Sequence, residues 1–122
     1  MIKERIKSFK FAIKGILLLF QSEPNAKIHL GITCIVISAG FFFSINITEW
    51  CLIILAIAMV LCAEGMNTAI EYLTDLVSPN FHNLAGKTKD VAAGAVLIAA
   101  VGSATIGGLI FFPKIWNYFF FY

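Results

Sequence analysis

Apolar residues occur along this chain in three long runs and in one helical stripe near the N-terminus. The runs at 28–48 and 91–113 contain no Asp, Glu, Lys or Arg, and each has the roughly 20 residues that a helix needs to cross a bilayer. The run at 50–63 is too short to cross alone at about 1.5 Å per residue. We therefore expect the second span to cover 50–70 and to include Glu64, which predicts an all-α membrane protein with three transmembrane helices.

Residues 1–22 show a different pattern, with apolar side chains on about 100° of a helical wheel. The apolar positions are Ile2, Ile6, Phe9, Ile13, Ile16, Leu17 and Phe20, and the lysines at 3, 7, 10 and 14 lie beside them. This pattern predicts an amphipathic helix at the membrane surface, with its lysines toward anionic headgroups. A helix packed on protein is the alternative. Pro24 should end this helix before the first span.

Composition and charge place the chain in a membrane and give it an orientation. It is 60% hydrophobic and 13% charged over 122 residues, whereas soluble domains carry about 25% charged residues. Of nine Lys and Arg, six precede the first span, two lie in the expected loop at 72–90, and Lys114 alone lies on the other side. Because positive charge favours the cytoplasmic side, we expect a single domain over 1–122 with the N-terminus inside and the C-terminus outside.

Two familiar motifs are excluded. The three cysteines, Cys34, Cys51 and Cys62, all lie in apolar stretches without a CxxC pair, so a zinc site is not expected. The sequence GKT at 86–88 lacks the preceding glycine of a phosphate-binding loop, since Phe81 stands at that position.

The second span ends in a polar face. Glu64, Asn67, Glu71 and Asp75 project from one side of a helix, and Glu64 lies about 21 Å along the axis from Trp50. An acidic residue inside a bilayer costs about 3 kcal/mol and usually faces protein, a cavity or a partner. Carboxylates that share a face repel one another, so we expect a divalent cation between them, and Mg²⁺ prefers such oxygen ligands.

Other interpretations of this face stay open at this point. Glu64 could pair with a lysine or bond to Asn67 and so hold helices together. The chain could also conduct protons or cations, or serve as an assembly subunit of a larger membrane complex. A conducting protein should carry acidic residues along the whole span, but here they stop at Glu64.

Further charged residues are expected at the same cytoplasmic level. Glu23 lies where the surface helix meets the first span, and the loop supplies His82, Lys89 and Asp90. Phosphoryl transfer needs a metal on the phosphates, cations against their charge, and a base for the attacking hydroxyl. Because Glu64 is deepest, where the hydroxyl of a lipid would lie, we interpret it as the base.

Two motifs resemble the signature of the prokaryotic diacylglycerol kinases, a family that includes the undecaprenol kinases. They are E-x-x-N-x-A-I-E at 64–71 and H-x-L-x-G-K-x-K-D at 82–90. The segment at 8–29 is also similar to that family, nearer its undecaprenol-kinase branch. The resemblance implies a homotrimer in the bacterial cytoplasmic membrane that transfers the γ-phosphate of ATP to a lipid alcohol with Mg²⁺, without any nucleic-acid partner. The alcohol would be undecaprenol or diacylglycerol.

The resemblance also implies roles for particular residues. Glu64 matches the general base and Asn67 an active-site polar residue, both at the lipid substrate. The expected metal ligands are Glu23 and Glu71. The residues expected at the nucleotide are Glu23, Glu71, His82, Lys89, Asp90 and, with an uncertain register, Arg5.

Overall fold

The computed structural model describes all 122 residues. They form four helices joined by short connections, and no strand. Helix α1 covers Ile2–Ser22, α2 covers Pro24–Phe42, α3 covers Ile47–Val77 and α4 covers Asn83–Phe120. Helices α2, α3 and α4 are each long and apolar enough to cross a membrane. The expectation of an all-helical chain is therefore confirmed, with three helices that could cross a membrane and a separate N-terminal helix.

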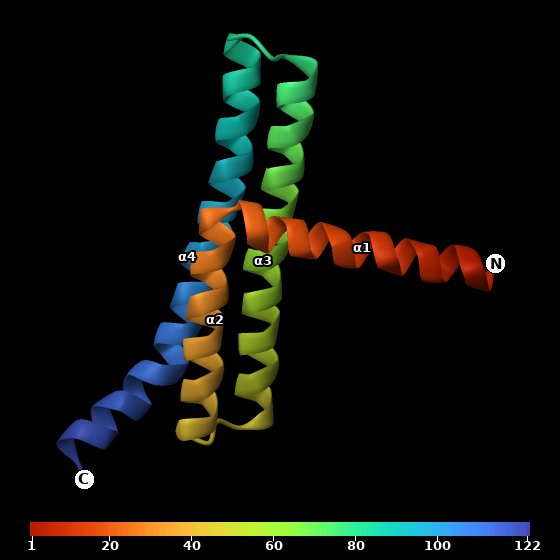
Figure 1. Cartoon of the computed structure of the whole chain (residues 1–122). Helices are drawn as coiled ribbons and strands as arrows, with labels where there is room; N and C mark the ends of the chain where they lie inside the picture. The colour runs from red at the N-terminus through yellow and green to blue at the C-terminus, as the bar shows by residue number, and fades with distance from the viewer.

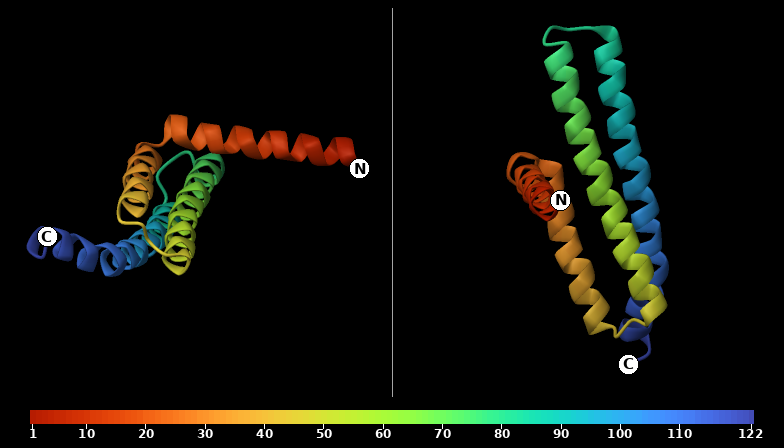
Figure 2. Two further views of the ribbon diagram at one scale, coloured as in Figure 1. Left: turned by 90° about the horizontal axis from the view of Figure 1, so that it is seen from below. Right: turned by 90° about the vertical axis from the view of Figure 1, so that its right-hand side faces the viewer.

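Helices α3 and α4 form a long antiparallel hairpin, and α2 lies beside only one half of it (Figure 1). Helix α1 crosses the hairpin near its middle, and its N-terminal part extends away from the other helices (Figure 1, and Figure 2, left). The crossing point is near Gly65 of α3, where the side chain of Leu19 lies next to the glycine. The half of the hairpin that carries the connection at 78–82 projects beyond α1 (Figure 1).

These dimensions match a bilayer. Helix α2 has 19 residues and is therefore about 28 Å long, close to the roughly 30 Å of a hydrocarbon core. The part of α3 from Ile47 to Gly65 has a similar length. Residue 64 is consequently level with the junction of α1 and α2, and the remainder of α3 extends past that level.

The first span was expected to cover 28–48, and its expected end lies beyond the end of the helix. Helix α2 stops at Phe42, and Ser44 takes a positive φ of 50° in the turn that follows. The side chain of Asn46 then accepts a hydrogen bond from the backbone of Glu49, while the Glu49 side chain accepts one from the backbone of Asn46. This reciprocal cap starts α3 at Ile47. The apolar run continues through the turn, so hydropathy alone does not show the boundary.

The expected loop at 72–90 is also wrong in extent, because only 78–82 connects the two helices. Helix α3 continues to Val77 and α4 begins at Asn83, after His82 has accepted a hydrogen bond from the backbone of Leu84 through its Nδ1. Polar and charged residues outside a bilayer can remain helical when they pack against a neighbouring helix. The polar segment is therefore a helical projection of the hairpin.

Small residues allow α4 to lie close to α3. Ala92 and Ala99 are buried, and the Ser103 hydroxyl donates a 3.0 Å hydrogen bond to the backbone carbonyl of Ala56 on α3. Close approach of this kind is typical of helix packing in membranes. The C-terminal part of α4 turns away from the bundle (Figure 1), consistent with the presence of Pro113 inside the helix.

Very little of this chain is buried within itself. Only 12 of 122 residues are buried, and large apolar side chains are exposed on all four helices. An exposed apolar surface of this extent requires a covering of lipid or of other protein.

Candidate active site

Glu64 faces protein. Its side chain is 3% exposed, and its Oε1 lies 3.2 Å from Nε2 of His29 on α2. Glu64 is one of the two buried polar residues of the whole chain, and the other is Thr68, one turn further along α3. The sequence predicted an inward-facing Glu64 but not the histidine beside it.

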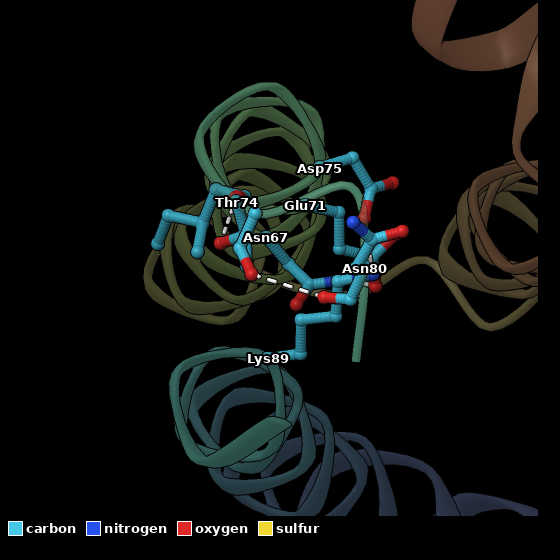
Figure 3. A network of polar contacts seen from close by, with 8 residues as sticks. Asn67, Glu71, Thr74, Asp75, Asn80 and Lys89 are labelled. Carbon is cyan, nitrogen blue, oxygen red and sulfur yellow. Dashed lines mark hydrogen bonds and ion pairs between the residues drawn. The ribbon is translucent and has the colours of Figure 1, made fainter. Parts of the chain in front are cut away.

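The remaining polar residues of α3 form a network that reaches α4 (Figure 3). Asn67 donates a 3.2 Å hydrogen bond from Nδ2 to Oε1 of Glu71. One turn beyond, Asp75 accepts a 2.5 Å hydrogen bond from Nζ of Lys89, which joins α3 to α4. The structure thus brings together four of the expected residues, Asn67, Glu71, Asp75 and Lys89, in the part of the hairpin that projects past α1.

The charge of Lys89 is stabilised by its neighbours. The hydrogen bond to Asp75 raises the pKa of Lys89 above its ordinary value of 10.5, and the negative charges of Asp75 and Glu71 add to this effect. An ammonium group has three donors, so Lys89 can bind a phosphate oxygen while it keeps its contact with Asp75.

Two buried polar atoms in this region have no partner within the chain. They are Oδ1 of Asn67 and the hydroxyl of Thr68. Because buried polar groups in proteins are nearly always hydrogen-bonded, these two atoms are ready to meet a ligand, water or a second chain.

Other expected site residues lie at the edges of this region. Glu23 is half-buried and precedes the first residue of α2, but its side chain makes no capping hydrogen bond. His82 caps α4, and Asp90 is exposed on the second turn of that helix. Arg5 is exposed near the free end of α1, which Figure 1 shows far from the hairpin. Within one chain, Arg5 therefore does not reach the network of Figure 3.

The donor chemistry of the site fits a hard cation. The oxygens of Glu71 and Asn67 are of the kind that Mg²⁺ prefers, and Mg²⁺ is usually held by one or two carboxylates together with substrate phosphates. No group of three or more His, Cys, Asp or Glu in the chain is close enough to form a complete metal cage. Any metal here would depend on ligands from elsewhere.

An apolar cavity of about 440 Å³ lies between α2, α3 and α4. His29 and Leu61 line one end and Phe111 the other, with small residues of α4, among them Ala104 and Gly107, along one wall. The cavity therefore runs from the contact of His29 with Glu64 along the apolar part of the bundle.

Sequence comparison decides the family. The family model described as "Prokaryotic diacylglycerol kinase" matches residues 10–111. The chain belongs to the prokaryotic diacylglycerol kinase family. The match includes the whole of α2 and α3 and most of α4, and both motifs of the polar face fall within it.

Curated relatives agree with this assignment. The undecaprenol kinase of Bacillus subtilis is 43% identical over 109 residues, 89% of each chain. The diacylglycerol kinase of Synechocystis is 34% identical over 88% of this chain and 62% of its own length. That of Haemophilus influenzae is 30% identical over 88% of this chain and 92% of its own. This member of the diacylglycerol kinase family is a membrane-bound, ATP-dependent lipid kinase, and the conducting and assembly-subunit hypotheses are set aside.

The sequence-based prediction missed His29 and Thr68. The signal for His29 was present, because it is the only titratable side chain in the run at 28–48 apart from the thiol of Cys34. A histidine is formally uncharged at neutral pH, so it does not interrupt the apolar run. Thr68 shares the helix face of Glu64, but a threonine is common inside helices of membranes.

Proposed function

We propose that this chain transfers the γ-phosphate of ATP to the hydroxyl of undecaprenol, with Glu64 as the general base. The observation that carries this proposal is the position of Glu64. It is buried, level with the crossing of α1, and next to a histidine that lines an apolar cavity. A carboxylate in that position can meet the hydroxyl of a lipid while the cytosolic nucleotide binds on the projecting hairpin.

The chemistry assigned to each residue follows from its place. The Glu64 carboxylate takes the proton of the lipid hydroxyl as the hydroxyl oxygen forms a bond to the γ-phosphorus, and the bond from that phosphorus to the bridging oxygen of ADP breaks. Lys89 offsets charge on the phosphates. Glu23 and Glu71 would hold a Mg²⁺ ion, which supplies charge neutralisation when it is bound.

Asn67 and three further residues complete the proposed site. The unpartnered Oδ1 of Asn67 supports a contact with a substrate. His82 and Asp90 lie at the same end of the hairpin as Lys89, and we assign them to the nucleotide. Arg5 joins them only if α1 of another subunit brings it there.

This geometry supports association of chains with shared sites, and the family resemblance implies that the assembly is a homotrimer. One chain leaves most of its apolar surface exposed, holds no complete set of metal ligands and directs Arg5 away from its own Lys89. Association of three chains would cover apolar surface and complete the site. Mass measurement of the protein in lipid nanodiscs should give three chains, and a monomer with full activity would exclude shared sites.

The location and orientation follow from the charges. We place the chain in the bacterial cytoplasmic membrane, with α1 at the inner surface and the C-terminus outside. The lysines of α1 and the charged residues of the projecting hairpin support this orientation. An amine-reactive reagent that cannot cross membranes should label Lys114 in intact cells but not Lys87, and the reverse pattern would invert the topology.

The preference for undecaprenol rests on similarity. The undecaprenol kinase of Bacillus subtilis shares 43% identity with this chain, against 30% and 34% for two diacylglycerol kinases. The decisive experiment offers purified protein, Mg-ATP and equal amounts of undecaprenol and diacylglycerol in one set of vesicles. Undecaprenyl phosphate should form first. Preferential formation of phosphatidic acid would refute the assignment of undecaprenol as the acceptor. The absence of both products would refute the kinase function.

A further inference from the structure

The contact between His29 and Glu64 is the only polar side-chain contact that joins α2 to α3. Nε2 lies 3.2 Å from Oε1, the histidine is 22% exposed and the glutamate 3%. The structure has thus placed a donor beside the buried carboxylate that the proposed function uses as its base.

The chemistry of the pair fixes which group donates. An ionised carboxylate only accepts hydrogen bonds, and an imidazole nitrogen beside it must carry the proton to interact favourably. With hydrogen on Nε2 the 3.2 Å contact with Oε1 is favourable, and Oε2 has no polar contact within the chain and stays free to accept a proton from a substrate. Thr68, buried on the same face of α3 without a partner, lies one turn beyond.

We propose that His29 is a positioning residue, which holds Oε1 of Glu64 through Nε2–H and so directs Oε2 toward the acceptor hydroxyl in the cavity. This inference rests on the proposed function. In the transfer step Oε2 gains the hydroxyl proton, the hydroxyl oxygen gains the γ-phosphorus and ADP leaves. The imidazole keeps its Nε2 proton throughout, and the proton on Glu64 returns to solvent after product release.

The location of His29 explains why a positioning group is useful there. A glutamate side chain has three rotatable bonds, and the cavity beside it is lined mostly by apolar residues. Among the residues that line the cavity, His29 is the one whose polar side-chain atom contacts the carboxylate. A well-oriented base is what proton transfer in the reacting complex requires.

The competing explanation is that His29 only ties α2 to α3. Three substitutions separate these roles: His29→Gln, His29→Asn and His29→Leu. Glutamine places an amide N–H at nearly the reach of Nε2, asparagine offers the same chemistry with a shorter reach, and leucine offers no donor. Ser38→Ala is the matched control, since Ser38 is exposed on α2 and its hydroxyl bonds only to the backbone of Cys34.

Each variant is purified and assayed in vesicles with Mg-ATP and undecaprenol, and its subunit number is checked by mass. His29→Leu should lower kcat roughly ten- to hundredfold, the loss expected for one hydrogen bond to a charged group, with the KM for ATP unchanged. His29→Asn should behave like leucine, whereas His29→Gln should recover most of kcat. Ser38→Ala should match the unaltered chain.

The outcomes decide between the roles. A kcat unaffected in His29→Leu, or lowered equally in the glutamine and asparagine variants, would overturn the inference. If leucine prevents assembly, the glutamine and asparagine pair still decides, because both are polar and differ mainly in reach. An unaltered chain without kinase activity would instead refute the proposed function, and the two failures are thereby distinguished.

Discussion

The two ends of the α3 helix are built differently. At its start, polar groups satisfy one another: Asn46 and Glu49 cap the helix reciprocally, and Glu49 pairs with Lys114 of α4 at 3.1 Å. From Glu64 onward, buried polar atoms of Asn67 and Thr68 have no partner. The polar groups at the start of α3 are therefore paired within the chain. Those from Glu64 onward keep unused hydrogen-bonding capacity for a ligand or a second chain.

Apolar packing shows the same contrast. The cluster of Ile45, Ile53, Ile110 and Phe111 is buried near the turn between α2 and α3, and the ring of Trp50 lies against Gly40, with Phe41 at a centroid distance of 4.9 Å. No comparable cluster surrounds the network of Figure 3. Changes near Glu71 should therefore affect catalysis, and changes near Trp50 should affect stability.

The largest of these effects is expected at Glu71. Glu71→Gln should raise the Mg²⁺ concentration for half-maximal activity at least about ten- to hundredfold, because loss of a residue that merely orients a metal ligand already costs that much. Thermal unfolding should change little, because Glu71 bonds only to Asn67. A metal titration of the lipid phosphorylation rate checks this, and an unchanged midpoint would remove Glu71 from the metal site.

Lys89 should give the next largest effect. Lys89→Ala should raise the KM for ATP about tenfold, because a phosphate loses a hydrogen bond from a charged donor. Initial rates over a range of ATP concentrations measure this KM. An unchanged KM would refute the proposed contact between Lys89 and a phosphate of ATP.

The pKa of Lys89 also predicts a pH dependence. Because Asp75 raises this pKa above 10.5, the favourable interaction is fully present below the ordinary value and is lost as pH rises through the raised value. Asp75→Asn should therefore shift the alkaline rise in the KM for ATP to lower pH. A profile that does not move would show that Asp75 does not act on Lys89.

Near the turn between α2 and α3, substitution of Gly40 tests the packing, and Gly31 on the same helix serves as the control. A Cβ at Gly40 would lie 2.6 Å from the ring of Trp50, whereas Gly31 has nothing within 4 Å. Gly40→Ala should destabilise the chain by about 1–3 kcal/mol, and Gly31→Ala should be neutral or slightly stabilising. Thermal unfolding in detergent compares them, and equal effects would contradict the packing.

The smallest effect is expected for the ion pair of Lys114 with Glu49. Both side chains are partly exposed, and ion pairs in such positions contribute little to stability. Lys114→Met should leave kinase activity unaltered and shift the unfolding midpoint only slightly. A large loss of activity would mean that the end of the bundle around Glu49 and Lys114 takes part in the reaction.

Much of this arrangement could be predicted from the sequence, for physical reasons. Three apolar runs required three spans, and the spacing of Glu64, Asn67, Glu71 and Asp75 required a common helix face. Pro24 separates α1 from α2 as expected, and it is the first residue of α2.

What could not be predicted depends on pairing between helices. The contact of His29 with Glu64 joins residues that lie far apart in the chain on separate helices, and no periodicity within one helix reveals it. The sequence underestimates the length of the polar hairpin, because charged residues that follow an apolar run have the composition of a loop. In the structure these charged residues remain helical beside α4, and Lys89 of α4 donates a hydrogen bond to Asp75 of α3.

The most direct test compares the chain with its Glu64→Gln variant in the same vesicles. Radiolabelled ATP, Mg²⁺ and undecaprenol are supplied, and labelled lipid is counted while subunit number and thermal unfolding are measured in parallel. We predict a loss of at least about 100-fold in transfer, the usual contribution of a general base, with assembly unchanged. A Glu64→Gln variant that still phosphorylates the lipid at a comparable rate would contradict the role of this buried carboxylate as the base.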